Sequence, residues 1–233
     1  MTYYLKGLVL KSQIHQESNC IITIFSEKGL TNVFVKKGLG KYNKHRTNIT
    51  PITLIEIIYE NKQNYLKILK DSSLINNYQK IKSNYDNIMT AGNLISAILD
   101  SQWFEKPAPL LFSLLINLLE NIPIFKNKKL LLSTFLLKIM KHDGLLDATN
   151  ICFNCQTIIS NNFFRHKGKV LCQKHTYNQA IHFNKNEQLF LITLANCRKI
   201  KDLINLDQFE INLFKKIHQL FKQTFNKDFI QSE

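Results

Sequence analysis

The apolar residues of this 233-residue chain change their spacing near Lys80. Before that point they alternate with polar residues or form short solid runs, in five stretches rich in Val, Ile, Thr, Tyr and Phe. A period of two is typical of half-buried strands. After Lys80 the spacing lengthens to three and four residues, as in Leu94, Ile95, Ile98 and Leu99, which is the period of amphipathic helices. The chain is therefore predicted to contain a β part followed by an α part.

The five predicted strands occupy the first 80 residues and are separated by turn signals rich in Gly, Asn and Pro. This strand number and size suit the oligonucleotide/oligosaccharide-binding (OB) barrel, although periodicity does not distinguish it from other small barrels. We predict an α+β multidomain chain. Residues 1–79 are expected to form a five-stranded OB-type β-barrel, and residues 80–233 an all-α domain with an inserted zinc knuckle at about 150–177.

Proline, glycine and capping residues indicate where the helices begin and end. Pro109 is expected to open one helix at its first turn, and Gly144 to end another. Two further helix starts are indicated by capping-box spacing, at Asn184 with Glu187 and at Asp207 with Glu210.

Four residues with metal-ligand chemistry lie in one 24-residue stretch. A Cys-x-x-Cys pair is followed, after sixteen residues, by Cys-x-x-His, and a Lys-Gly turn between them predicts a hairpin that brings the pairs together. Structural zinc takes four N or S ligands in a tetrahedron, so we predict a structural zinc site. His166 lies near the hairpin tip and is expected to face solvent. The predicted ligands are Cys152, Cys155, Cys172 and His175.

Other roles for these cysteines are less favoured. A redox Cys-x-x-Cys motif needs a βαβ setting, which is absent, and a catalytic zinc keeps one coordination position open. The odd total of five cysteines does not suit a secreted disulfide framework. Cys20 and Cys197 lie in apolar stretches and are expected to be buried, inert thiols.

Basic residues concentrate between Lys28 and Asn48, where no acidic residue interrupts them. The whole chain carries a net charge of +14, which attracts nucleic acid, although abundant Lys, Asn and Ile also suit a biased genome composition. A cationic groove with aromatic rings between the charges can bind a nucleic-acid backbone and stack on its bases. The alternative interpretation is that this stretch is a solvated, lysine-rich loop without a binding function. The predicted DNA-binding residues are Lys11, Lys36, Lys37, Lys41, Tyr42, Lys44 and Arg46.

Within this basic stretch, two aromatic residues differ in their expected roles. Val33 and Val35 flank Phe34, so Phe34 is expected in the barrel core rather than on a stacking surface. Tyr42 lies between polar residues and is the better stacking candidate. Gly38 and Gly40 are expected to give the loop conformational freedom.

Two other function classes compete with nucleic-acid binding. A nuclease needs clustered carboxylates for metal ions, and only the pairs Asp143/Asp147 and Glu56/Glu60 come near that requirement. A zinc-stapled adaptor that holds RNA or protein would share the same composition and knuckle. The most apolar run, residues 110–119, is too short to span a bilayer, and no signal segment is evident, so a cytoplasmic protein without a membrane is expected.

Several short motifs lie in the first 80 residues. They are Gly7-Leu8-Val9-Leu10-Lys11, Glu17-Ser18, Thr23-Ile24-Phe25-Ser26 with Gly29, Lys37-Gly38 and Pro51-Ile52. They are followed by a helical domain and by a Cys-x-x-Cys pair after Gly144-Leu145. In these motifs and in their order, the chain resembles the bacterial RecO family of DNA repair proteins.

The resemblance implies a non-enzymatic recombination mediator that binds single- and double-stranded DNA and anneals complementary strands. It also implies that the protein acts together with RecR and binds the acidic C-terminal tail of single-stranded-DNA-binding protein. In this way it would indirectly help to load RecA onto DNA. Phe125, Leu131 and Phe135, with nearby lysines, could form a groove for that tail, although packing as helix core is the favoured fate of these three. The chain departs from the family pattern at His175, where zinc-bearing members usually have a cysteine, and in using lysine where the family tends to use arginine.

Overall fold

The structure is a computed structural model that describes residues 2–40, 43–61, 67–199, 202–203 and 210–225. The chain divides into two compact units, residues 1–123 and 124–233. The first unit holds the predicted strands and also the first helices, so the boundary predicted after residue 79 falls within it. Residue 79 is where the strands give way to helices. Whether it is also a limit between domains stays a prediction.

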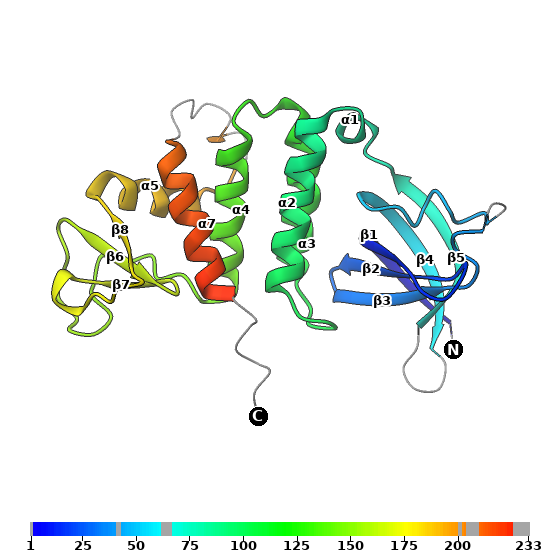
Figure 1. Cartoon of the computed structure of the whole chain (residues 1–233), viewed down its shortest axis with the longest axis horizontal. Coiled ribbons are helices and arrows are strands. Elements are labelled where there is room, and N and C mark those ends of the chain that lie inside the picture. The colour runs from blue at the N-terminus through cyan, green and yellow to red at the C-terminus, as the bar shows by residue number, and fades with distance from the viewer. Residues whose placement is uncertain (1, 41–42, 62–66, 200–201, 204–209, 226–233) are drawn as a thin grey trace. The chain divides into compact units, whose positions relative to one another are not determined.

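Five strands form a closed barrel in the order β1-β2-β3-β5-β4 (Figure 1), which confirms the predicted five-stranded barrel. Neighbouring strands pair antiparallel except β3 and β5, which meet in parallel at Phe34 and Ile68 and close the barrel. The strands are β1 (Thr2–Ile14), β2 (Cys20–Ser26), β3 (Gly29–Val35), β4 (Thr53–Asn61) and β5 (Lys67–Asn76).

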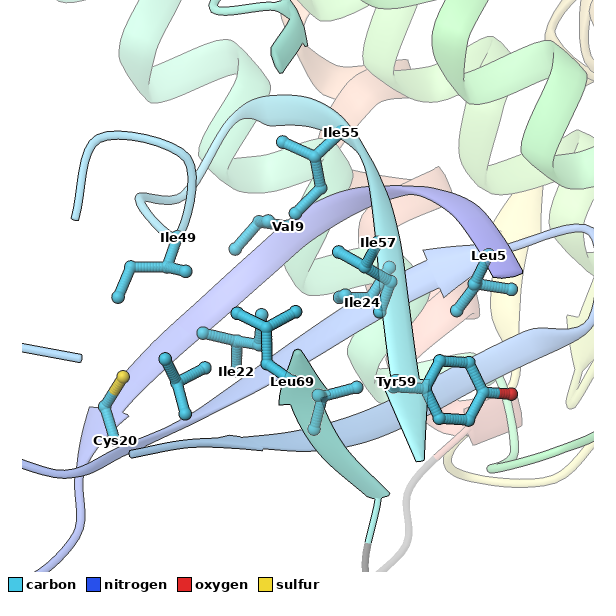
Figure 2. Packing of buried hydrophobic residues seen from close by; sticks show 12 residues of the cluster. Leu5, Val9, Cys20, Ile22, Ile24, Ile49, Ile55, Ile57, Tyr59 and Leu69 are labelled. Atoms are coloured by element: carbon cyan, nitrogen blue, oxygen red, sulfur yellow. The ribbon is translucent and has the colours of Figure 1, made fainter. Parts of the chain in front are cut away.

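The barrel interior is filled by aliphatic side chains from all five strands (Figure 2). Cys20 is fully buried among them, as predicted. Val33 and Val35 point into the core, and therefore Phe34 points away from it and packs its ring edge-on against His15, with ring centroids 6.0 Å apart. The prediction that Phe34 is core was wrong, because three consecutive apolar residues do not reveal which face is buried.

The helices of the first unit return to the barrel. Asn84 caps α2 by accepting a hydrogen bond from the Asn87 amide at 3.1 Å, and Pro109 opens α3 as predicted. Between them, the Glu105 amide donates to the Leu30 carbonyl at 2.9 Å, beside the start of β3. The elements are α1 (Gln79–Lys82), α2 (Tyr85–Ser101), α3 (Pro109–Asn121) and the 3₁₀ turn η2 (Ile122–Ile124).

Within the described residues, the second unit contains three helices of twelve or more residues and a small sheet of order β7-β6-β8. Helix α4 ends at His142, and Gly144 follows its C-cap with a φ of 71°, so that the predicted glycine terminates the helix; the next amide, of Leu145, donates to the Met140 carbonyl at 2.8 Å. The capping box at Asn184 and Glu187 is present, whereas Asp207 lies outside the described residues. The elements are α4 (Lys128–His142), β6 (Phe163–His166), β7 (Lys169–Leu171), η3 (Gln173–His175), β8 (Ile181–Phe183), α5 (Lys185–Asn196) and α7 (Ile211–Phe225).

Cys197 follows the end of α5 and is half-buried, with its thiol donating to the Lys199 carbonyl at 3.1 Å. The prediction of a buried thiol was wrong here, because the apolar run before it belongs to a helix that ends at Asn196. None of the helices within the described residues is both long and apolar enough to cross a membrane.

Candidate metal centre and nucleic-acid interface

The four predicted ligands are brought together by the small sheet of the second unit. Cys152 and Cys155 lie on a turn whose two ends meet in a bridge between Ile151 and Ile158. Cys172 directly follows β7, and His175 ends the 3₁₀ turn η3. Their ligand atoms all lie within 4.8 Å of one another, and the described residues contain no second such group.

The separations between these atoms suit a tetrahedral zinc ion. Two sulfurs about 2.3 Å from a common zinc lie about 3.8 Å apart in a tetrahedron, and a sulfur and a nitrogen about 3.5 Å apart. The Cys155 and Cys172 sulfurs are 3.8 Å apart. The His175 Nδ1 atom lies 3.3 Å from the Cys172 sulfur and 3.7 Å from the Cys152 sulfur. The donor set therefore fits zinc with Nδ1 as the nitrogen ligand.

Backbone amides around Cys152 favour its thiolate, which is the form that binds metal. Burial raises the pKa of Cys152, but backbone hydrogen bonds from Cys155, Cys172 and Asn154 outweigh it and leave a pKa of about 6. The Cys172 amide, for example, donates to the Cys152 sulfur at 3.3 Å. Three thiolates and one imidazole fill a four-coordinate shell, so these residues could hold a structural zinc with no position left for substrate.

The hairpin of β6 and β7, which lies between the two ligand pairs, is less exposed to solvent than the sequence suggests. Its turn is Lys167-Gly168, as predicted, and Gly168 has a φ of 80° with its α-carbon against the Leu145 carbonyl, where a Cβ would lie only 1.7 Å from the oxygen. His166 does not face solvent; it is half-buried, with its ring 5.6 Å from that of Tyr177. That prediction was wrong because the partner ring comes from a later part of the chain.

Arg165 is the residue that the sequence least reveals. Its neighbours suggest a basic, exposed hairpin tip, yet its side chain is fully buried. The guanidinium donates to Gln188 Oε1 at 3.0 Å and to the carbonyls of Asp147 and Gly168 at 2.9 and 3.1 Å. Burial lowers the pKa of Arg165 to about 10. Arg165 thus joins the hairpin to helix α5 and to the segment that precedes the first cysteine pair.

The basic stretch of the first unit forms an ordered loop after β3. The Lys37 amide donates to Asn19 Oδ1 at 2.8 Å, and the Lys37 carbonyl accepts from Asn43 Nδ2 at 2.9 Å. Gly38 is buried, and a Cβ there would lie 2.5 Å from the Cys20 sulfur. Gly38 therefore allows close packing against the barrel rather than loop freedom, and the expectation of freedom there was wrong.

A hollow of about 600 Å³ lies between this loop and strand β5. Its charged rim is formed by Lys36, Lys37, Lys44 and Lys70, and Asn43 and His45 also line it. Lys70 was not predicted; it directly follows the core residue Leu69 on β5, so its side chain points to the outer face.

Two of these lysines face carboxylates. Lys44 Nζ lies 2.8 Å from Asp71 Oδ1, and Lys70 Nζ lies 2.7 Å from Glu60 Oε2. All four side chains are at least a third exposed, so these pairs are weak and can exchange for other anions. The hollow is therefore a cationic surface with exchangeable counter-charges.

The remaining predicted DNA-binding residues are not all at this hollow. Lys11 is exposed on β1 opposite Thr23, and Arg46 is exposed in the loop, but neither lines the hollow. Lys41 and Tyr42 lie outside the described residues.

Within the described residues, the carboxylate pairs Asp143/Asp147 and Glu56/Glu60 belong to no group of three or more possible metal ligands. Asp143 Oδ1 lies 2.9 Å from His142 Nδ1, and Glu60 pairs with Lys70. The three apolar residues considered for a groove are buried as helix and loop core, as favoured; they are Phe125, Leu131 and Phe135.

Comparison with known proteins gives matches over nearly the whole chain. Residues 1–78 match the family Recombination protein O N terminal, and residues 75–203 match Recombination protein O C terminal. The chain is 33% identical over 222 residues to DNA repair protein RecO of Chlamydia trachomatis serovar L2, covering 95% of this chain and 91% of that protein.

Other relatives carry the same name. The chain is 32% identical to DNA repair protein RecO of Chlamydia muridarum, covering 95% of each protein. The identity to the Thermodesulfovibrio yellowstonii protein of that name is 24%, over 87% of this chain and 81% of that protein. With both terminal family regions matched in order, this chain belongs to the RecO family of DNA repair and recombination proteins.

Proposed function

We propose that this protein is a non-enzymatic recombination mediator of the cytoplasm that binds single- and double-stranded DNA through its barrel. The observation that carries the proposal is the lysine-rimmed hollow between the basic loop and β5. Lysines bind phosphate as point charges and release counterions from the nucleic acid, which drives binding that is largely independent of sequence. The family membership supports DNA as the polymer.

Strand annealing follows from the same charge. Two complementary strands repel each other through their phosphates, and a dense cationic surface lowers that repulsion while it holds the strands close together. The net charge of +14 and the cluster of lysines at one hollow support this activity.

Cooperation with RecR, binding of the acidic tail of single-stranded-DNA-binding protein, and indirect help to RecA complete the proposal. They rest on family membership. Because Phe125, Leu131 and Phe135 are buried, they do not supply an open apolar groove for that tail.

The knuckle acts as a structural staple in this proposal. Cys152, Cys155, Cys172 and His175 would hold a zinc ion, which would cross-link a turn, a strand end and a 3₁₀ turn that have little core of their own. The protein's own residues, Arg165 above all, connect this cross-linked region to helix α5.

The proposal is tested by titrating labelled single-stranded DNA with purified protein across a salt series, and then adding the complementary strand. We expect binding that weakens steeply with salt and annealing that is faster than without protein. A protein that binds structured RNA in preference to DNA and does not speed annealing would instead be a zinc-stapled adaptor.

A double variant, Lys36→Gln with Lys37→Gln, sharpens this test. Each lost phosphate contact lowers the salt slope on single strands by about 0.7, so the double variant is expected to lose about 1.4. The matched control is Lys215→Gln with Lys222→Gln, which removes the same charge from exposed positions of α7. An equal loss of slope in both variants would contradict a localised DNA site.

A further inference from the structure

A second hollow lies on the outer face of the barrel, over strands β1, β4 and β5. Its volume is about 360 Å³. Leu5 and Ile57 point into the barrel core, so the alternate residues on these strands point outward. The register places Tyr4, Ile58 and Asp71 in one row across the three strands, and Lys6, Glu56 and Ser73 in the next. All six line the hollow.

The chemistry of this hollow differs from that of the lysine-rimmed one. Tyr4 is 71% exposed and lies next to the half-buried Ile58. Glu56 and Asp71 supply carboxylate oxygens, which accept hydrogen bonds from amino groups, and Lys6 lies opposite Glu56 on β1. A flat apolar surface beside such acceptors suits a nucleobase that carries an exocyclic amino group.

The two hollows share a boundary. Lys44 lines the lysine-rimmed hollow and Asp71 lines this one, and their side chains are joined at 2.8 Å. Beside them, His45 Nδ1 lies 2.7 Å from Ser72 Oγ. A single strand whose phosphate occupies the lysine-rimmed hollow could therefore continue past Asp71 and across β4 to Tyr4, which lies two strands away in the same row.

We propose that this hollow is a base-binding subsite for single-stranded nucleic acid, in which Tyr4 stacks on an unpaired base and Glu56 accepts a hydrogen bond from its amino group. The proposal rests on the proposed DNA binding of the adjacent hollow. The bases of a duplex are stacked on one another and cannot lie flat on Tyr4. The subsite therefore adds affinity for single strands only, and it favours cytosine over thymine, which has no exocyclic amino group.

The test compares the wild type with Tyr4→Ala, Tyr4→Phe and Glu56→Gln. Affinities are measured for labelled 12-residue oligo(dC) and oligo(dT) and for a duplex of random sequence, each across a salt series. We expect Tyr4→Ala to bind both single strands about fivefold or more weakly, because one base–aromatic stack is lost. The salt slope and the duplex affinity are expected to stay at wild-type values, since stacking involves no phosphate.

Tyr4→Phe keeps the ring and is expected to bind like the wild type. Glu56→Gln is expected to reduce the preference for oligo(dC) over oligo(dT), because the amide also offers a donor to thymine carbonyls. Tyr4→Ala at wild-type affinity for single strands, or an equal loss on the duplex, would overturn the subsite and leave the proposed DNA binding intact. A wild type that binds neither form of DNA would overturn the proposed function itself.

Discussion

The barrel loop and the zinc knuckle are both irregular segments rich in polar residues, yet different forces hold them. The loop after β3 packs on the hydrophobic core of the barrel: Ile49 belongs to that core, and Gly38 lies close to the Cys20 sulfur. Within the loop, the Asn43 side chain donates a hydrogen bond to the Lys37 carbonyl. The knuckle has short strands of three or four residues with a few buried apolar side chains, such as Phe163 and Val170, one buried arginine, and four residues that could hold a metal ion. We therefore expect the barrel alone to carry the proposed DNA surface, and the knuckle to need its proposed metal ion for full stability.

The largest expected effect comes from breaking the metal site. Cys152→Ser removes a buried ligand, and we expect loss of bound zinc and local unfolding of the region around residues 150–183. Structural zinc contributes on the order of 10 kcal/mol to such regions. Metal content by mass spectrometry and amide hydrogen exchange would measure both. Cys197→Ser is the matched control, because Cys197 lies outside the ligand group and its variant should retain zinc. Unchanged exchange in the knuckle of a zinc-free protein would contradict the staple.

The second effect is confined to the barrel. Ile24→Ala truncates a fully buried side chain of the core and is expected to lower the free energy of unfolding of the first unit by about 3–4 kcal/mol. Ile14→Ala is the matched control, because Ile14 is 75% exposed, and its effect should stay within about 0.5 kcal/mol. Chemical denaturation measures the change. Release of zinc by Ile24→Ala would show that the two regions do not stand independently.

A smaller effect is expected at the buried arginine. Arg165→Ala leaves Gln188 Oε1 and two carbonyls without their donor and should destabilise the second unit by about 2–4 kcal/mol. Arg198→Ala, at an exposed position after α5, is the control. Exchange at amides of α5 and of the hairpin should rise in Arg165→Ala alone; protection equal to the wild type would show that Arg165 does not join them.

The smallest expected effect is a pH dependence at the base of the barrel loop. Burial, and next the charge of Lys44, lower the pKa of His45 below its ordinary value of 6.5, while Asp71 opposes them. The folded barrel therefore holds His45 neutral. Its contribution to stability is complete above the unfolded pKa and is lost as pH falls through the folded pKa.

Unfolding free energies of wild type and His45→Gln, measured between pH 7.5 and pH 4.5, check this sign. The difference between them should change in favour of the variant as the pH falls. A difference that is constant over this range would contradict the neutral histidine.

Much of the fold follows from local signals in the sequence. The strand period, the helix start at Pro109, the helix end at Gly144 and the capping box at Asn184 are each set by neighbours in sequence, and the structure confirms them. The metal ligands were also predictable, because two pairs separated by a hairpin turn meet through short-range geometry.

The errors concern contacts between distant residues. Phe34 could be placed on either face until the packing of Val33 and Val35 was known. Arg165 reads as a solvated tip residue because its acceptors, Asp147 and Gln188, are 18 and 23 residues away in the chain. Lys70 lines the same hollow as the loop lysines because β5 pairs with β3 when the barrel closes. This pairing is between distant segments, so no local sequence pattern predicts it.

The central claim is that the barrel loop binds DNA and that the knuckle has only a structural role. The most direct test is the salt dependence of single-stranded DNA binding, measured as its slope in three proteins. These are the wild type, the double variant Lys36→Gln with Lys37→Gln, and Cys152→Ser. We predict that Cys152→Ser keeps the slope of the wild type, while the double variant loses about 1.4. A slope that falls in Cys152→Ser and is unchanged in the double variant would contradict the barrel loop as the DNA surface and assign that role to the knuckle.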